Sequence, residues 1–451
     1  MFFNLAMFSF VLVLLLSILY STLCADIQLG NSLLIHYVLA ILFVYFVLKN
    51  KNCVSYAIFN VCFLGYGLLT LITQQTLINN PFEDFYIHND AAWSFYSNIM
   101  EFAIPNSLSE LTNITLLNPY FYHYPLAAYI FGGIAKLGLL FGIDDIRLLL
   151  RMHCFTLAAL IVAQICALLH HRKISVQKNM RLIFLFSFCT YLYVSSGVFT
   201  RDIHVCFLYS LMGYIMLKDT NCKLIKLVAV SVLMFGMRPQ NGMLAIAFVL
   251  LYYLFARSKI STFVKLFSVL AIIVIVILGF PYINIEKNME SFSIYHQEAL
   301  SQVGGVFQSV YALPFPINKI AMLFYMCMQP LPVIGRYMIG TGGSYLTIPF
   351  VLSPYVLSYF LIPSICYSIK NYHSKNRTSC VFVLIYFMGF FLIIFGSPDL
   401  RRAFAVIPGL FMAFFLIKGD INKSVFIKIR RIVWPIIAFI SIILSVYVVS
   451  K

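Results

Sequence analysis

The sequence predicts an all-α polytopic integral membrane protein with about 13 transmembrane helices. Of its 451 residues, 62% are hydrophobic and only 10% are charged, and the mean hydropathy is +0.93. Apolar runs of about twenty residues, the length that crosses a bilayer core as a helix, recur along the chain. No class of soluble globular protein fits this composition.

The first expected span, residues 5–24, has no basic residue before it and no small-residue cleavage site. We therefore expect a retained first helix rather than a signal peptide. The later expected spans are 31–48, 53–73, 150–170, 180–198, 203–218, 223–237, 241–256, 263–281, 346–369, 379–396, 402–418 and 432–449. The 11 cysteines are scattered without metal-ligand spacing, so we expect small buried side chains and no metal site.

Basic residues gather in every second loop, and this alternation predicts the orientation. The basic loops contain Lys49 and Lys51; His170 to Lys173, Lys178 and Arg181; Lys218, Lys223 and Lys226; Arg257, Lys259 and Lys265; Lys370, Lys375 and Arg377; and Lys418, Lys423, Lys428, Arg430 and Arg431. These loops should face the cytoplasm, which places the N-terminus inside and the C-terminus outside. The formal charge of +16 then reflects membrane orientation, and no nucleic-acid partner is expected.

Two apolar stretches, 120–141 and 317–340, would break this alternation if they crossed the membrane. We interpret them as interfacial helices within two long outer loops, 74–149 and 282–345. Loops of this length are usually functional. Because no repeat or linker separates parts of the chain, residues 1–451 are predicted to form a single membrane domain.

Arginines lie in or beside the predicted outer loops, where they do not serve orientation. They are Arg147, Arg151, Arg201, Arg238, Arg336, Arg401 and Arg402. A guanidinium can donate two parallel hydrogen bonds to a phosphate or a carboxylate. We therefore expect a phosphate-bearing lipid substrate at the outer face. Arg201 is as readily explained by a pair with the adjacent Asp202, whereas Arg238 has no acidic neighbour in sequence.

The first outer loop carries the candidate general base. Residues 81–96 combine three carboxylates, one histidine and six aromatic side chains just after a span. A carboxylate there, Asp84 or Asp90, could accept a proton from a sugar hydroxyl while aromatic faces pack on sugar rings. Asp90 could equally cap a helix over 91–102, and the aromatic residues could form an interface belt.

The segments 118–130 and 141–147, with Tyr-Pro-Leu entering a helix and a Phe-Gly…Arg turn, resemble membrane glycosyltransferases of the GT-C superfamily. Where these enzymes usually have Pro-Pro, this chain has the single Pro125. The resemblance implies a GT-C-like fold, a polyprenyl-phosphate-linked donor and an acidic residue in the first outer loop, here Asp84 or Asp90.

Four further segments resemble Wzy-type polymerases of O-antigen and capsule repeat units: 196–202, 237–242, 329–332 and 398–408. The resemblance implies a bacterial inner (plasma) membrane enzyme that polymerises undecaprenyl-pyrophosphate-linked oligosaccharides at the periplasmic face. It needs no cofactor, and a chain-length regulator is a candidate partner.

The residues then expected to bind the pyrophosphate or lipid-linked sugar are Arg147, Arg201, Arg238, Arg336, Arg401 and Arg402. Two alternatives stay open, a GT-C enzyme that adds a single sugar and, less favoured, a lipid-linked oligosaccharide flippase or other transporter. A transporter should carry charges near the midplane and often has inverted repeats.

Overall fold

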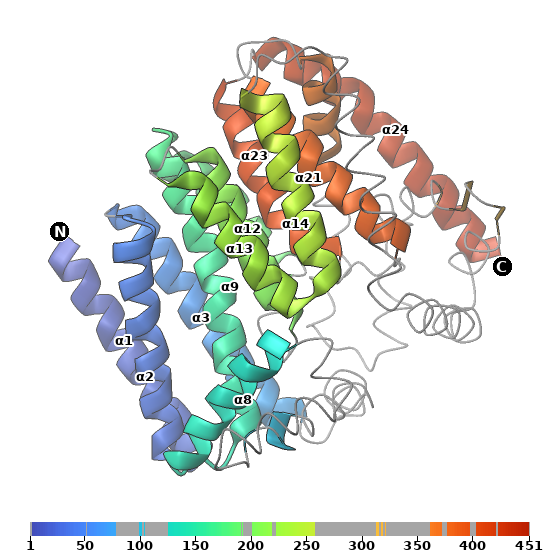
Figure 1. Ribbon diagram of the computed structural model, residues 1–451. Coiled ribbons are helices and arrows are strands. Elements are labelled where there is room, and N and C mark those ends of the chain that lie inside the picture. The colour runs from blue at the N-terminus through green and yellow to red at the C-terminus, as the bar shows by residue number, and fades with distance from the viewer. Residues whose placement is uncertain are drawn as a thin grey trace. The chain divides into compact units, whose positions relative to one another are not determined.

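The computed structural model describes residues 2–50, 52–77, 99–101, 125–190, 201–218, 222–257, 361–371, 377–396, 403–420 and 423–450, with a few isolated positions besides. All regular elements in these ranges are helices, and none is a strand (Figure 1). The chain divides into two compact units. Unit 1 comprises Met1–Gly242 and Met338–Phe350, and unit 2 comprises Met243–Tyr337 and Val351–Lys451. That these units form one membrane domain stays a prediction.

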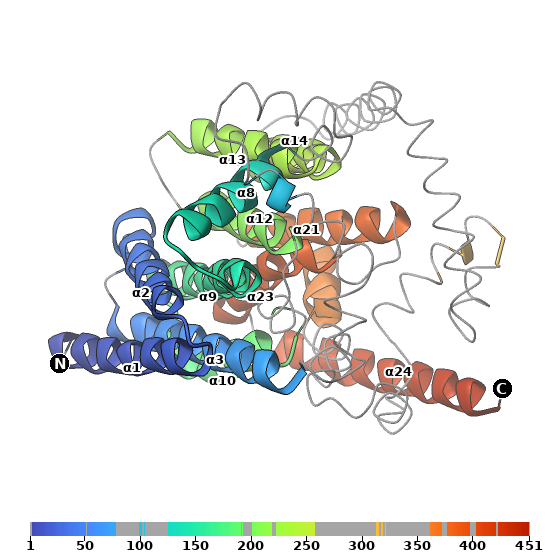
Figure 2. The ribbon, with the colours of Figure 1, turned by 90° about the horizontal axis from the view of Figure 1, so that it is seen from below.

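Most helices of unit 1 follow the expected spans closely, but the span predicted over 180–198 differs, because the helix there begins at Val176 and ends at Phe188. The helices of this unit are α1 (Phe2–Leu23), α2 (Ile27–Leu42) with the π-helical continuation η1 (Phe43–Val47), α3 (Cys53–Leu77), α8 (Pro125–Leu140), α9 (Ile146–His171), α10 (Val176–Phe188), α12 (Asp202–Leu217) and α13 (Lys223–Met237). Helix α9 is central, because it packs against α2, α3, α8, α10 and α12 (Figure 2). Nearly all of its side chains are buried.

Unit 2 contains most of α14 (Pro239–Tyr252), η2 (Tyr253–Arg257), α21 (Arg377–Gly396), η4 (Phe404–Val406), α23 (Ile407–Asp420) and α24 (Lys423–Ser450). Its aromatic core forms where α14, α21 and α23 come together. The Phe248 and Tyr386 rings lie 5.0 Å apart, and Gly409 lets α23 lie directly against the Tyr386 ring. Small residues commonly allow such close approach between membrane helices.

Three helices among the described residues are long and apolar enough to cross a membrane: Ile27–Val47, Cys53–Ile72 and Ile146–His171. Several shorter apolar helices accompany them, including those of α12, α14, α21 and α23. The expectation of a helical membrane protein is thus supported by its helices. The number of 13 spans and the GT-C-like arrangement stay predictions.

Helix α24 begins earlier than expected. Residues 423–431 were assigned to a cytoplasmic loop, but they form the first turns of a helix that continues to Ser450. Lysine and arginine are good helix formers, and the Arg430 guanidinium lies 3.7 Å from the centre of the Trp434 ring, one turn further on. The basic residues therefore belong to the helix and not to a loop before it.

Helix α8, the apolar stretch that was not counted as a span, packs against α9 and α13. Leu126 in its first turn lies against Gly236, near the end of α13. Gly138 in its last turn lies against Ile146 and Leu149, at the start of α9. In its middle, Phe131 packs against His153, two turns into α9, so α8 runs alongside the first turns of α9 in the opposite direction.

The first three helices are joined by buried polar contacts. Asn60 on α3 donates to Ser9 Oγ on α1 at 2.8 Å and accepts from the Tyr37 hydroxyl on α2 at 3.0 Å. Ser17 Oγ on α1 donates to the carbonyl oxygen of Gly30 on α2 at 2.8 Å. Hydrogen bonds of this kind stabilise helix pairs in lipid, where water cannot take the place of a partner.

We expect Gly30→Ala to separate α1 from α2. A Cβ at this position would lie 2.0 Å from Ser21 Oγ and 2.6 Å from the Ser17 carbonyl oxygen, a backbone atom that cannot rotate away. The expected loss is about 1–3 kcal/mol of unfolding free energy, measured by denaturant unfolding in detergent micelles. Gly133→Ala is the matched control, since nothing lies within 4 Å of its Cβ position. Equal stability of the two variants would contradict this packing.

Candidate functional site

One end of unit 1 collects the loops that the charge pattern assigned to the cytoplasm. The Tyr214 hydroxyl donates to the Leu48 carbonyl oxygen at 2.7 Å, and Asn52 Nδ2 lies 3.1 Å from His170 Nδ1. Three basic side chains at this end donate hydrogen bonds to backbone carbonyl oxygens: Lys218 to that of Leu48, Arg172 to that of Leu217 and Lys223 to that of Met216. Three loops expected on one side of the membrane therefore do meet.

The opposite end of unit 1 is capped by carboxylates. Asp26 accepts from the backbone N–H of Leu29 at 3.1 Å, which caps α2, and from that of Asp144 at 3.2 Å. Asp145 caps α9 by accepting from the Leu148 N–H at 2.9 Å. Such caps satisfy amide donors that have no partner within the helix. These contacts join the starts of α2 and α9.

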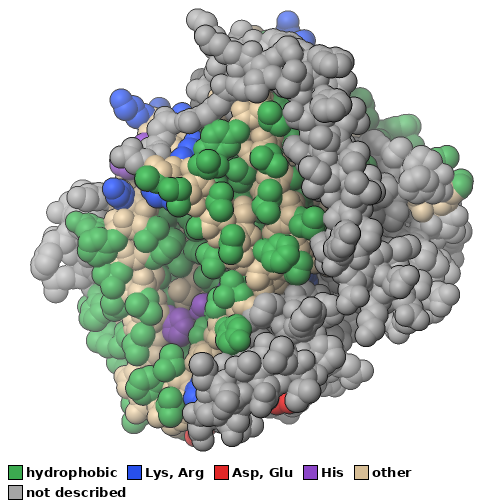
Figure 3. Space-filling view, in the orientation of Figure 1, with side chains coloured by type: hydrophobic (Ala, Val, Ile, Leu, Met, Phe, Trp, Pro, Cys, Tyr) green, Lys and Arg blue, Asp and Glu red, His purple; other side chains and the backbone are tan. Residues whose placement is uncertain are grey.

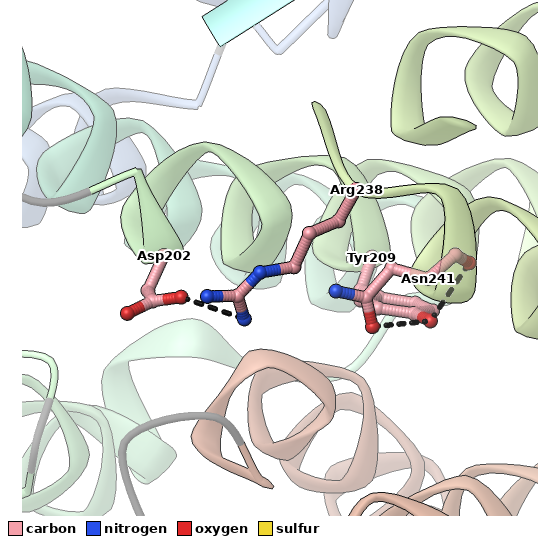
Figure 4. Close-up of polar contacts among 4 residues, drawn as sticks. All are labelled: Asp202, Tyr209, Arg238 and Asn241. Carbon is pink, nitrogen blue, oxygen red and sulfur yellow. Dashed lines mark hydrogen bonds and ion pairs between the residues drawn. The ribbon is translucent and has the colours of Figure 1, made fainter. Parts of the chain in front are cut away.

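A buried ion pair, Arg238 with Asp202, lies at the same end as these caps. The Arg238 Nη1 atom lies 3.0 Å from Asp202 Oδ1, and the two side chains are 11% and 7% exposed (Figure 4). The N–H bonds of the guanidinium are not aimed along this line, so the contact is an ion pair rather than an aligned hydrogen bond.

The local sequence explains how Arg238 reaches α12. The residue before a proline is disfavoured in helical conformation, and Arg238, which precedes Pro239, is extended at φ −158° and ψ 111°. Beyond this turn, the Tyr209 hydroxyl donates to the Asn241 carbonyl oxygen at 3.1 Å (Figure 4). Helix α12 thus holds the turn between α13 and α14 at two points.

Three of the arginines proposed as ligands of a substrate lie at this end of unit 1. Arg201 is the N-cap residue of α12 and Arg147 lies in the first turn of α9, both half-buried. Arg238 pairs with Asp202, the acid that sequence proximity had offered to Arg201. The other proposed site residues, Asp84, Asp90, Arg336, Arg401 and Arg402, lie outside the described residues.

Sequence reasoning missed a group of three histidines, one each from α2, α9 and α12. His153 Nε2 lies 2.8 Å from His204 Nε2, and the His36 and His153 ring centres are 6.1 Å apart. Phe131 of α8 packs edge-on against the His204 ring at 4.6 Å. Figure 3 shows histidine side chains on the apolar face of unit 1. No group of three or more His, Cys, Asp or Glu in the described ranges has metal-site geometry.

The apolar helices, with charged groups at the two ends of unit 1, define a polytopic helical membrane protein. No protein-family model, no curated protein and no solved structure matches this chain. The function therefore has to be argued from the residues themselves.

Proposed function

We propose that this protein is a membrane glycosyltransferase that joins undecaprenyl-pyrophosphate-linked oligosaccharide repeat units into O-antigen or capsule. Its site would lie at the periplasmic face of a bacterial inner membrane. The observation that carries the proposal is the separation of charges in unit 1, with Arg147, Arg201 and Arg238 at one end and the lysine-rich loops at the other. Chemistry on a lipid headgroup needs its ligands at one membrane face.

In this proposal the arginines bind the pyrophosphates of donor and acceptor. A guanidinium has five N–H donors, so Arg238 can hold Asp202 with one edge and still donate to phosphate oxygens. Asp202 then orients the arginine. Arg336, Arg401 and Arg402 of the outer loops are proposed to complete the set.

The proposed reaction uses Asp90 or Asp84 as the general base. The carboxylate takes the proton of the acceptor sugar hydroxyl while its oxygen forms a bond to the anomeric carbon of the donor. The bond from that carbon to the pyrophosphate breaks, and the arginines stabilise the negative charge that develops on the leaving group.

Two other functions each have one observation in their favour. A GT-C enzyme that adds a single sugar is favoured by α8, which begins at Pro125, the proline of the Tyr-Pro-Leu segment that resembles these enzymes. A flippase or other transporter is favoured by His36, His153 and the buried Arg151, which lie within helices rather than at their ends.

The deciding experiment is a surface-polysaccharide gel from the native host with the gene deleted. The deletion strain is complemented with the wild type, with Asp90→Ala, with Arg147→Ala and Arg201→Ala, and with Lys178→Ala. Lys178 is an exposed residue at the opposite end and serves as the control. A ladder that collapses to lipid core bearing one repeat unit is the result expected for the deletion and the first three variants.

The same gel separates the alternatives. A surviving ladder whose repeat unit has lost one sugar would establish the single-sugar transferase instead. An unchanged ladder in the deletion strain would exclude both enzymes and favour a transporter of a different substrate. A defect in Lys178→Ala equal to that of the arginine variants would contradict a site at the capped end.

A further inference from the structure

The three histidines of unit 1 are brought together by helices far apart in sequence. His153 and His204 face each other through the same ring atom, Nε2, at 2.8 Å, and their ring centres lie 4.9 Å apart. The His36 Nδ1 atom hydrogen-bonds to the Ser32 carbonyl oxygen at 2.8 Å. His36 meets the pair through an edge contact between its ring and that of His153. Ionisable groups inside membrane helices are costly and are usually functional.

The separation of the two nitrogens identifies what lies between them. Two histidines that bind one tetrahedral Zn²⁺ at about 2.0–2.1 Å would hold their nitrogens about 3.3–3.4 Å apart. The observed 2.8 Å is the length of a hydrogen bond in which one ring donates and the other accepts. A single proton therefore fits this site, and a metal ion does not.

The pair reaches from the surface of unit 1 into its interior. His36 and His153 are partly exposed, whereas His204 is 5% exposed and its Nδ1 has no hydrogen-bond partner among the described residues. A buried ring nitrogen without a hydrogen-bond partner costs free energy. It also gives the pair one nitrogen at which a proton can be gained or lost. The ring that donates can become the ring that accepts when a proton enters at one Nδ1 and leaves at the other.

The surroundings of the pair oppose uptake of a second proton. The titratable or charged groups on the helices around it include His36 on α2, Lys136 on α8, Arg151 and Cys154 on α9, Asp202 and Cys206 on α12, and Arg238 at the end of α13. Asp202 is engaged by Arg238 and lies two residues from His204, a spacing that does not share a helix face. Two positive rings 4.9 Å apart would repel each other strongly.

We propose that His153 and His204 form a proton-binding site that shares one proton along the line between the two Nε2 atoms, takes up one further proton at an Nδ1 atom and connects the surface of unit 1 to its interior. The site is distinct from the arginines at the capped end, and the proposal does not rest on the glycosyltransferase activity. The ligand is the proton itself.

The test is nitrogen NMR of the full-length protein, labelled with ¹⁵N in its histidines and held metal-free in lipid nanodiscs. We expect a scalar coupling between two histidine Nε2 nuclei, which only a shared hydrogen bond transmits. As the pH is lowered, the coupled pair should take up one proton and not two, because two positive rings would repel each other. His153→Gln and His204→Gln should each lose the coupling, and His36→Gln should keep it.

Wild-type protein alone can overturn the proposal, so the result does not depend on whether a variant folds. Absence of the coupling, together with two rings that titrate independently, would show that no proton is shared. Binding of one Zn²⁺ that shifts both rings together would show a metal site instead. Loss of the coupling in His36→Gln would mean that a different pair had been observed.

Discussion

Replacing Arg238 with alanine is expected to cost about 3–5 kcal/mol of unfolding free energy, the usual loss when one partner of a buried ion pair is removed. The loss arises because Asp202, only 7% exposed, would keep its charge without the guanidinium that neutralises it. The turn between α13 and α14 would also lose one of the two points at which α12 holds it. Denaturant unfolding in detergent micelles measures the change.

The matched control removes both charges. Arg238→Met combined with Asp202→Asn leaves no unpaired ion, so it should be much closer to the wild type than Arg238→Ala alone. Equal destabilisation by the single and the double variant would contradict a charge effect. Arg238→Lys separates stability from the proposed function, because it keeps the positive charge but loses the fork that binds phosphate through two parallel bonds.

The second large effect is expected for Gly242→Ala. A Cβ at Gly242 would lie 2.4 Å from the Cα and 2.7 Å from the backbone nitrogen of Phe235, near the end of α13. Backbone atoms cannot rotate away, so the turn that carries Arg238 and Asn241 would have to move. The overpacking should cost about 1–3 kcal/mol or more, measured by the same unfolding experiment.

A shift of this turn should also affect the ion pair. In Gly242→Ala, removal of Arg238 is expected to cost less than in the wild type, because the pair is already weakened. Gly133→Ala is again the control for adding a methyl group to a helix in open space. An unchanged cost of Arg238→Ala in the Gly242→Ala background would mean that the turn does not position the arginine.

Much of the helix arrangement in unit 1 follows from hydropathy and charge. The expected span 223–237 has the same limits as α13, and 203–218 differs from α12 by one residue at each end. Apolar runs set the lengths of these helices, and cations mark one set of ends. At 423–431 the same rule was wrong, since basic residues were taken as a loop although their side chains favour a helix.

The site could be predicted only in part. The sequence did show that Arg147, Arg201 and Arg238 lie at helix ends, since each follows or precedes an apolar run. The pairing of Arg238 with Asp202 was not, because it depends on how α12 and α13 lie side by side. The pairing of His153 with His204 was missed for the same reason, since one sequence does not reveal the rotation of each helix about its axis. The caps at Asp26 and Asp145 did have a signal, an aspartate just before an apolar helix.

The enclosure of α9 has a consequence for biogenesis. Ile146–His171 is apolar enough to enter a bilayer by itself, yet 94% of its apolar window is buried by protein. When α9 enters the bilayer, α12 has not yet been synthesised. The side of α9 that α12 later covers must therefore first face lipid. Arg151 and Gln164, now buried, are poorly tolerated in that interim state. Exchange of lipid for the later helices would therefore relieve a cost within α9.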